Sequence, residues 1–195
     1  MSPTFPIACD APEEAAPTDV TVPAEVVAAA QRGEVAAQER LLRGLQDVIY
    51  RFCLAQLGEA EATEDATQET ALRLLRRLDN FRGDSQIKTF ALGIALNVCR
   101  ESRRQAKRFP AEGLPIDETP SSQAAASEAF QRNEAHARLH RLLDRLSARQ
   151  REIVVLRYLE QLSVAETAAT VGVATGTVKA TAAQALAKIR QWWSE

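Results

Sequence analysis

The sequence predicts an all-α protein in which two small helical domains are joined by a flexible linker. Apolar residues recur at helical spacing over most of the 195-residue chain. One proline-rich stretch has no such period and separates the helical regions, as a linker does. The predicted units are a disordered acidic tail at 1–23, a first domain at 24–108, a linker at 109–127 and a second domain at 128–195.

The composition indicates an intracellular protein whose cysteines are reduced and which does not insert directly into a membrane. The net charge is −2, but the first 25 residues hold five acids and no Lys or Arg, so the remaining chain carries +3. The three cysteines form no CxxC pair, which argues against a disulfide scaffold. No apolar run approaches the ~18 residues that span a bilayer, and the N-terminus lacks the features of a secretory signal.

Three helices are predicted before residue 80: a short one over 24–31, a long one from Glu34 to Leu57, and a third from about Glu64 to Leu78. Two faces can be read on the third helix. Its inward face consists of Ala71, Leu74, Leu75 and Leu78, and its separate acidic face consists of Glu64, Asp65, Gln68, Glu69 and Leu72. Acids beside an exposed leucine suit a docking surface for a basic partner helix, although a solvated charged face fits the same pattern.

The next predicted helix, from Gln86 to about Arg108, follows a loop and carries a basic stripe. Residues 100–108 hold five basic residues against one Glu, a local charge of +4. One side of the helix is apolar, and the opposite side presents Thr89, Gly93, Asn97, Arg100 and Arg104, with Arg103 close by. This pattern suits a nucleic-acid backbone, and Phe81 and Phe90 could stack on an unpaired base. Alternatively, both rings belong to the core and the arginines match the dipole at the helix end.

The second domain is predicted to open with a helix from about Glu128 to Leu146. It contains His136 and His140, which share a helix face, but two further metal ligands are missing nearby, so solvated or partner-facing histidines are favoured over a metal site. A capping box of Ser147 and Gln150 begins the next helix, which runs to Glu160. That helix leaves Arg149, Arg151 and Arg157 for phosphates or partners.

The stretch from Leu162 to Ile189 has the spacing of a helix-turn-helix. Ser163 and Glu166 form a capping box, Gly172 can end the helix in a left-handed conformation, and Thr175 can cap a second helix. Val178, Ala182, Ala185, Leu186 and Ile189 face inward on that helix, and Thr177, Ala180, Thr181, Gln184 and Lys188 face outward. The outward residues suit base edges and phosphates, whereas an ordinary helical hairpin would show the same faces.

Three motifs in this order resemble an extracytoplasmic-function (ECF) RNA polymerase sigma factor of the sigma-70 family. They are TEDATQETALRLLRRLDNFRG, IALNVCRESRR and LDRLSARQREIVVLRYLEQLSVAETAATVGVATGTVKA, and the similarity spans about Val26 to Arg190. This chain departs from the usual family sequence at several positions. In the first domain, Phe90 and Ala91 stand where the family often has Trp and Leu, Glu101 replaces the usual Asp, and Ala71 replaces the usual Phe. On the last helix, Ala180 and Thr181 replace the usual Ser and Arg, and Gln184 replaces a frequent basic residue.

The resemblance implies a non-enzymatic alternative sigma factor without a cofactor. Core RNA polymerase would bind through its β′ clamp helices to Glu64, Asp65, Gln68, Glu69 and Leu72, and through its β flap to the second domain. The minus-ten promoter element would be melted and held by Asn80, Phe81, Arg82, Ile87, Lys88, Phe90, Asn97, Arg100, Arg103 and Arg104. The minus-thirty-five element would be read by Arg157, Thr175, Thr177, Lys179, Thr181, Gln184 and Lys188.

The resemblance further implies a bacterial cytoplasmic, nucleoid-associated protein that is controlled by an anti-sigma factor. The two missing cations on the last helix would each change the salt dependence of DNA binding by about one unit, so weak binding by the isolated second domain is expected. Two other functions compete with this one. A stand-alone helix-turn-helix regulator would have no need of the acidic face, and an enzyme would need a catalytic set that the sequence does not show.

Overall fold

The computed structural model describes residues 22–108 and 138–194, and all the secondary structure in these ranges is helical. The predicted all-α class and the two helical domains are confirmed. Residues 1–21 of the acidic tail, the linker, and His136 lie outside the described residues. The elements are α1 (Ala24–Gln31), α2 (Val35–Leu57), α3 (Ala60–Arg77), the 3-10 turn η1 (Leu78–Asn80), α4 (Ile87–Arg108), a helix over 138–144, α6 (Ala148–Val154), the π-helical turn η2 (Val155–Leu159), α7 (Val164–Val171) and α8 (Thr175–Ser194).

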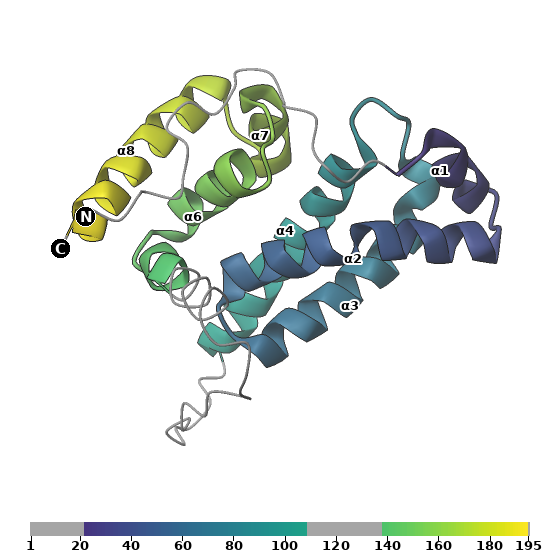
Figure 1. Ribbon diagram of the computed structural model, residues 1–195, viewed down its shortest axis with the longest axis horizontal. Helices are drawn as coiled ribbons and strands as arrows, with labels where there is room; N and C mark the ends of the chain where they lie inside the picture. Colours follow the sequence, from purple (N-terminus) through teal and green to yellow (C-terminus); the bar gives the residue numbers. More distant parts are fainter. Residues whose placement is uncertain (1–21, 109–137, 195) are drawn as a thin grey trace, which may run out of the picture.

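Helix α2 forms the centre of the first domain and packs against α1, α3 and α4 (Figure 1). An apolar stripe of this helix is fully buried, including Leu41, Leu45, Ile49 and Phe52. The helix ends at Gly58, whose φ of 78° is a left-handed conformation that a side chain would disfavour. The stripe therefore holds three neighbouring helices in place around one core.

Helix α3 differs from its prediction at both its start and its inward face. It begins at Ala60, four residues earlier than expected, and its N-cap Glu59 makes no side-chain capping bond. Without a capping residue the sequence carries no local start signal. Ala71 and Leu75 are only half-buried, whereas Thr63 and Thr70 are fully buried. Both hydroxyls donate to the carbonyl one turn earlier, which removes the cost of burying them.

The second domain contains the predicted helix-turn-helix, formed by α7 and α8. Ser163 and Glu166 make both bonds of a capping box at the start of α7, and Gly172 ends that helix with φ at 79°. Helix α8 begins at Thr175 itself, because the carbonyl of Ala174 accepts the first helical hydrogen bonds. The expectation that Thr175 is the cap is therefore wrong by one residue.

The helix predicted over 148–160 changes form in its last turn. The Ser147–Gln150 capping box is present, but after Val154 the chain continues as a π-helical turn. The Glu160 amide donates to the carbonyl of Val155, five residues earlier, over 2.9 Å. This wider turn places Glu160 at the boundary between the domains, with only 2% of its surface exposed.

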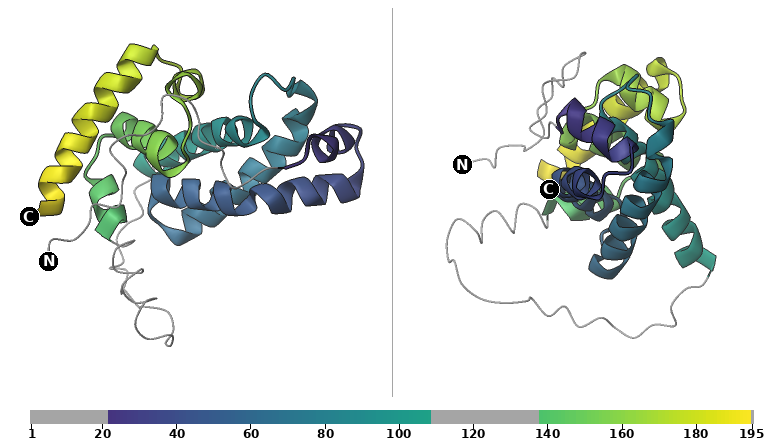
Figure 2. Two further views of the ribbon diagram at one scale, coloured as in Figure 1. Left: turned by 45° about the horizontal axis from the view of Figure 1, so that its top comes forward. Right: turned by 90° about the vertical axis from the view of Figure 1, so that its right-hand side faces the viewer.

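The two domains pack against one another, which the sequence does not predict. Helix α7 lies against α4, and η2 lies against α2 (Figure 1). Helix α8 packs on α6 and α7 and lies on the outer side of the second domain, away from α3 (Figures 1 and 2). Among the described helices, none combines the length and apolar character that crossing a bilayer demands.

Candidate functional surfaces

The acidic face of α3 is open to solvent. Glu64, Asp65 and Gln68 are exposed, and Leu72 is 51% exposed, which is unusual for a large apolar side chain in this fold. Helix α3 packs on α2 and α4, on the part of the first domain that lies away from α8 (Figure 1). The structure therefore brings the predicted docking residues together on one accessible surface.

Glu69, the fifth predicted docking residue, is occupied by a contact within the chain. Its Oε1 accepts from Arg73 Nε over 2.6 Å, and Arg73 also pairs with Glu101 Oε2 of α4 over 2.7 Å. The hydrogen bond from Arg73 lowers the pKa of Glu101, and the same bond raises the pKa of Arg73. Arg73 thus ties α3 to α4. Sequence reasoning noted Glu101 only as a departure from the family and missed this role.

The loop before α4 and the first turn of α4 hold the two predicted stacking rings side by side. Phe81 and Phe90 have centroids 5.3 Å apart at an angle of 51°, and both are half-buried. Gln31 of α1 fixes the loop, because its Nε2 donates to the carbonyls of Leu78 and Phe81. The two rings are therefore neither fully buried in the core nor fully exposed. The neighbouring predicted residues Asn80 and Arg82 are exposed.

The first turn of α4 is buried, and two of its residues, Lys88 and Thr89, contact the second domain. Ile87 is 7% exposed and Lys88 is 5% exposed, so neither is accessible as predicted for a DNA contact. Lys88 Nζ donates to the Glu160 carbonyl over 2.9 Å and lies 3.2 Å from Glu160 Oε2. Thr89 Oγ1 donates to Glu166 Oε1 over 3.2 Å.

Glu166 contributes to both the cap of α7 and the domain contact. Burial raises its pKa, but hydrogen bonds from Ser163 and Thr89 and the charge of Lys88 outweigh burial, so the pKa of Glu166 is lowered. The carboxylate is therefore held in its charged form where it faces α4. The charged carboxylate is the form that competes with a bound anion for the hydrogen bonds that Ser163 and Thr89 donate.

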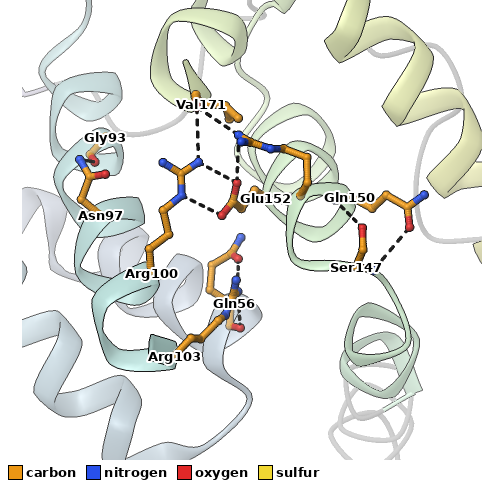
Figure 3. A network of polar contacts seen from close by, with 10 residues as sticks. Gln56, Gly93, Asn97, Arg100, Arg103, Ser147, Gln150, Glu152 and Val171 are labelled. Carbon is orange, nitrogen blue, oxygen red and sulfur yellow. Dashed lines mark hydrogen bonds and ion pairs between the residues drawn. The ribbon is translucent and has the colours of Figure 1, made fainter. Parts of the chain in front are cut away.

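Arg100 makes a bidentate contact between the domains. Its Nε and Nη2 donate to the two carboxylate oxygens of Glu152 over 2.9 and 2.8 Å (Figure 3). The Glu152 side chain is only 5% exposed, and its hydrogen bond raises the pKa of Arg100. Arg149 approaches the same carboxylate at 3.5 Å, and both arginines donate to the Val171 carbonyl at the end of α7.

The remaining arginines of the predicted stripe divide between structural and accessible roles. Arg103 Nη2 donates to the carbonyl and the side-chain oxygen of Gln56, which is fully buried (Figure 3). Arg151 of α6 donates to the same carbonyl over 2.8 Å, and burial lowers its pKa. By contrast, Arg104 and Asn97 are exposed and bond only to their own helix. The sequence predicts the basic character of these arginines but not their partners.

The outward face of α8 is accessible. Thr175, Thr177, Lys179, Gln184 and Lys188 are exposed and Thr181 is half-buried. Arg157, which was predicted to join them, is 5% exposed and donates to the Leu162 carbonyl. Its place in the π-helical turn directs it into the domain, so its predicted phosphate contact is not supported by the structure. No cluster of metal-ligating side chains occurs among the described residues.

Comparison with protein families identifies both domains. Residues 41–109 match Sigma-70 region 2, and residues 136–189 match Sigma-70, region 4. ECF RNA polymerase sigma factor SigD of Mycobacterium tuberculosis is 33% identical over 173 residues, which cover 85% of this chain and 81% of the relative. The chain belongs to the ECF sigma factors of the sigma-70 family. Sigma factors are transcription initiation factors and not enzymes.

Other relatives of this sigma factor agree. ECF RNA polymerase sigma factor BldN of Streptomyces coelicolor is 32% identical over 170 residues, covering 85% of this chain and 63% of the relative. Two solved structures share the fold. CnrH in complex with the cytosolic domain of CnrY has a TM-score of 0.66 at 20% identity and covers 87% of this chain and 96% of its own. RpoE of Bartonella quintana in complex with the anti-sigma factor NepR has a TM-score of 0.64 at 21% identity, with coverages of 78% and 94%.

Proposed function

We propose that this sigma factor binds core RNA polymerase through the acidic face of α3 and directs the enzyme to promoters through α4 and α8. The observation that carries the proposal is the exposure of Leu72 beside Glu64, Asp65 and Gln68. An apolar side chain within an acidic rim suits a basic, amphipathic partner helix such as those of the β′ clamp. Glu69 supports this face through Arg73 and Glu101, so it orients the surface as well as contributing charge.

For the minus-ten element, we assign strand capture to the loop before α4 and to α4 itself. The half-buried pair of Phe81 and Phe90 presents an aromatic surface beside exposed Asn80 and Arg82, which suits stacking on an unpaired base. Further along the helix, Asn97 and Arg104 are accessible for the backbone. Ile87, Lys88, Arg100 and Arg103 remain in this proposed set, but Ile87 is buried and the other three bond to partners within the chain.

For the minus-thirty-five element, we assign the outward face of α8. Gln184 suits adenine, Thr177 and Thr181 suit a thymine methyl or a phosphate, and Lys179 and Lys188 suit phosphates, with Thr175 at the helix start. The face has few cations, so core polymerase must supply much of the promoter affinity. The β flap would hold the second domain at this element.

We further infer control by an anti-sigma factor and a cytoplasmic location at the bacterial nucleoid. The support is by analogy, because the RpoE structure of similar fold is a complex with an anti-sigma factor. A regulator of this kind needs an accessible surface on the free sigma factor, and the faces of α3 and α8 both supply one.

A charge reversal on α3 tests the proposal. Asp65→Arg places a cation where a basic partner helix would dock, so we expect loss of binding in a pull-down with core polymerase and loss of run-off transcription. Glu39→Arg is the matched control, because Glu39 is an exposed acid of α2 outside this face. A folded Asp65→Arg protein that binds core as well as the control would contradict the assignment of this face.

A further inference from the structure

Two buried cysteines meet inside the first domain, at the contact between α2 and α4. Cys53 of α2 and Cys99 of α4 are free thiols, and each is fully buried. The two helices pack directly against one another. The two thiols are hydrogen-bond partners, so their sulfur atoms are in contact. The fold therefore brings together two nucleophilic groups that are far apart in the sequence and that no step of the proposed function uses.

A second contact, one helical turn further along both helices, fixes the same register. Gln56 follows Cys53 by three residues and Arg103 follows Cys99 by four, so each lies on the same helix face as its cysteine. Arg103 Nη2 donates to the carbonyl and to the side-chain oxygen of Gln56 (Figure 3). Consecutive turns of α2 and α4 thus face one another. The meeting of the two cysteines follows from how the helices pack, and not from the rotamer of one side chain.

The two thiols differ in their readiness to ionise. The hydrogen bond from the Cys99 thiol lowers the pKa of Cys53 and outweighs burial, which acts in the opposite direction. The hydroxyls of Thr67 and Thr70 of α3 lie within hydrogen-bonding reach of the same sulfur. By contrast, the hydrogen bond to Cys53 and burial raise the pKa of Cys99, and the positive charge of Arg103 offsets little of this. Because the thiolate is the nucleophilic form of cysteine, Cys53 is the reactive sulfur and Cys99 is the proton donor beside it.

One side of this thiol pair lies close to the surface of the domain. Thr67, which approaches the Cys53 sulfur, is half-buried, whereas Thr70 is fully buried. A local opening of α3 past Thr67 would admit a small uncharged molecule such as hydrogen peroxide. A bulky oxidant such as a glutathione disulfide would need the helices to separate. The burial of the pair therefore selects a small peroxide as the co-reactant.

We propose that Cys53 and Cys99 form an oxidative modification site, at which hydrogen peroxide converts the two thiols into a disulfide that joins α2 to α4. The Cys53 sulfur attacks the peroxide, the O–O bond breaks, and Cys53 becomes a sulfenic acid while the departing hydroxide takes up the thiol proton and leaves as water. The Cys99 sulfur then attacks the sulfenic sulfur, and its proton leaves with the sulfenic oxygen as a second water. The two thiols together lose two electrons, and one peroxide is reduced to two waters.

The full-length variant Cys9→Ser tests the site without a change to the core, because it leaves Cys53 and Cys99 as the two cysteines of the chain. We expect brief treatment of the folded protein with hydrogen peroxide to protect both thiols from alkylation in denaturant until a reductant is added. Peptide mapping by mass spectrometry should show Cys53 linked to Cys99. Two free thiols after treatment of the folded chain, or a disulfide that forms only when peroxide is added in urea, overturns the proposal.

Two serine variants in the Cys9→Ser background separate the roles of the two sulfurs. Cys99→Ser keeps a hydrogen-bond donor beside Cys53 but removes the second thiol, so we expect the reaction to stop at a sulfenic acid on Cys53 that dimedone traps. Cys53→Ser is the matched control, in which the remaining thiol stays protonated, so we expect dimedone labelling to be about tenfold slower. Circular dichroism checks that both variants are folded. Equal labelling of the two folded variants overturns the assignment of Cys53 as the reactive sulfur, and the Cys9→Ser result decides the disulfide by itself.

The stability of the first domain reports whether the bond fits the native packing. A disulfide between positions 53 and 99 closes a long loop and lowers the entropy of the unfolded chain. We expect oxidised Cys9→Ser to have an unfolding equilibrium constant about 10³-fold smaller than the reduced protein, in urea titrations followed by circular dichroism, and we expect reduction to reverse the change. A disulfide that forms but lowers stability would show that α2 and α4 must leave their native contact to make it, and would overturn the proposed site.

Discussion

Replacing Lys88 by Met isolates the free energy of the buried pair between the domains. The ammonium group lies 3.2 Å from Glu160 Oε2, and the two side chains are 6% and 2% exposed. Removing one partner of such a pair leaves an unpaired buried charge, which costs about 3–5 kcal/mol where the site stays closed. Here the cost has a ceiling, because the domains can separate and return Glu160 to water. We therefore expect a loss of about 3 kcal/mol or less in the unfolding free energy of the second domain.

Urea denaturation followed by tryptophan fluorescence measures this loss. The two tryptophans of the chain, Trp192 and Trp193, both lie in α8, so the signal reports on the second domain. The double variant Lys88→Met with Glu160→Gln removes both charges and should recover most of the loss, to within ~1 kcal/mol of the unmodified chain. Lys107→Met, at an exposed position near the end of α4, should change stability by less than ~0.5 kcal/mol.

Two results would refute the reasoning. If Lys88→Met is as stable as Lys107→Met, the pair does not contribute to the packing of the domains. If the double variant is as unstable as Lys88→Met alone, the loss comes from packing of the lysine stem and not from a charge left without its partner.

Two further predictions concern the second domain. The lowered pKa of Glu166 means that its charged form stabilises the fold above its unfolded pKa of about 4.3, and that this contribution is lost as the pH falls through the lower folded pKa. The difference in unfolding free energy between the unmodified chain and Glu166→Gln should therefore be constant at neutral pH and shrink in acid, in urea titrations at several pH values; a constant difference would contradict this. Gly172→Ala should lower stability by about 1 kcal/mol because φ is 79°, whereas Gly176→Ala, inside α8 with open space around it, should raise it by up to ~1 kcal/mol, both seen in thermal melts. Equal effects of the two alanines would argue against the left-handed cap.

Much of the local structure of this protein could be predicted because its signals are short. The capping boxes at Ser147 and Ser163 each involve residues three apart, and both are present. Prediction failed where no such signal exists. Helix α3 begins without a side-chain cap, and no local motif in the sequence marks the π-helical turn after Val154.

The candidate surfaces also include residues whose exposure could be predicted from the sequence and residues whose burial could not. The acidic face of α3 and the outward face of α8 could be predicted, because the helical period alone decides which side chains share a face. Arg157 and Lys88 were expected to be accessible, and both are buried. A charged residue beside an apolar stripe is usually solvated, and only its partner in the fold decides otherwise.

By itself, the sequence determined most of the helices, the acidic face of α3, the outward face of α8 and the family to which the chain belongs. Only the tertiary structure decided that the basic face of α4 is closed by acids of the second domain. The physical reason is the range of the interactions. Helix periodicity and caps depend on residues within a few positions of one another, whereas the contacts that cover α4 join residues 52 to 77 positions apart. Complementary charges at such separations have many alternative partners in a sequence, and folding selects one.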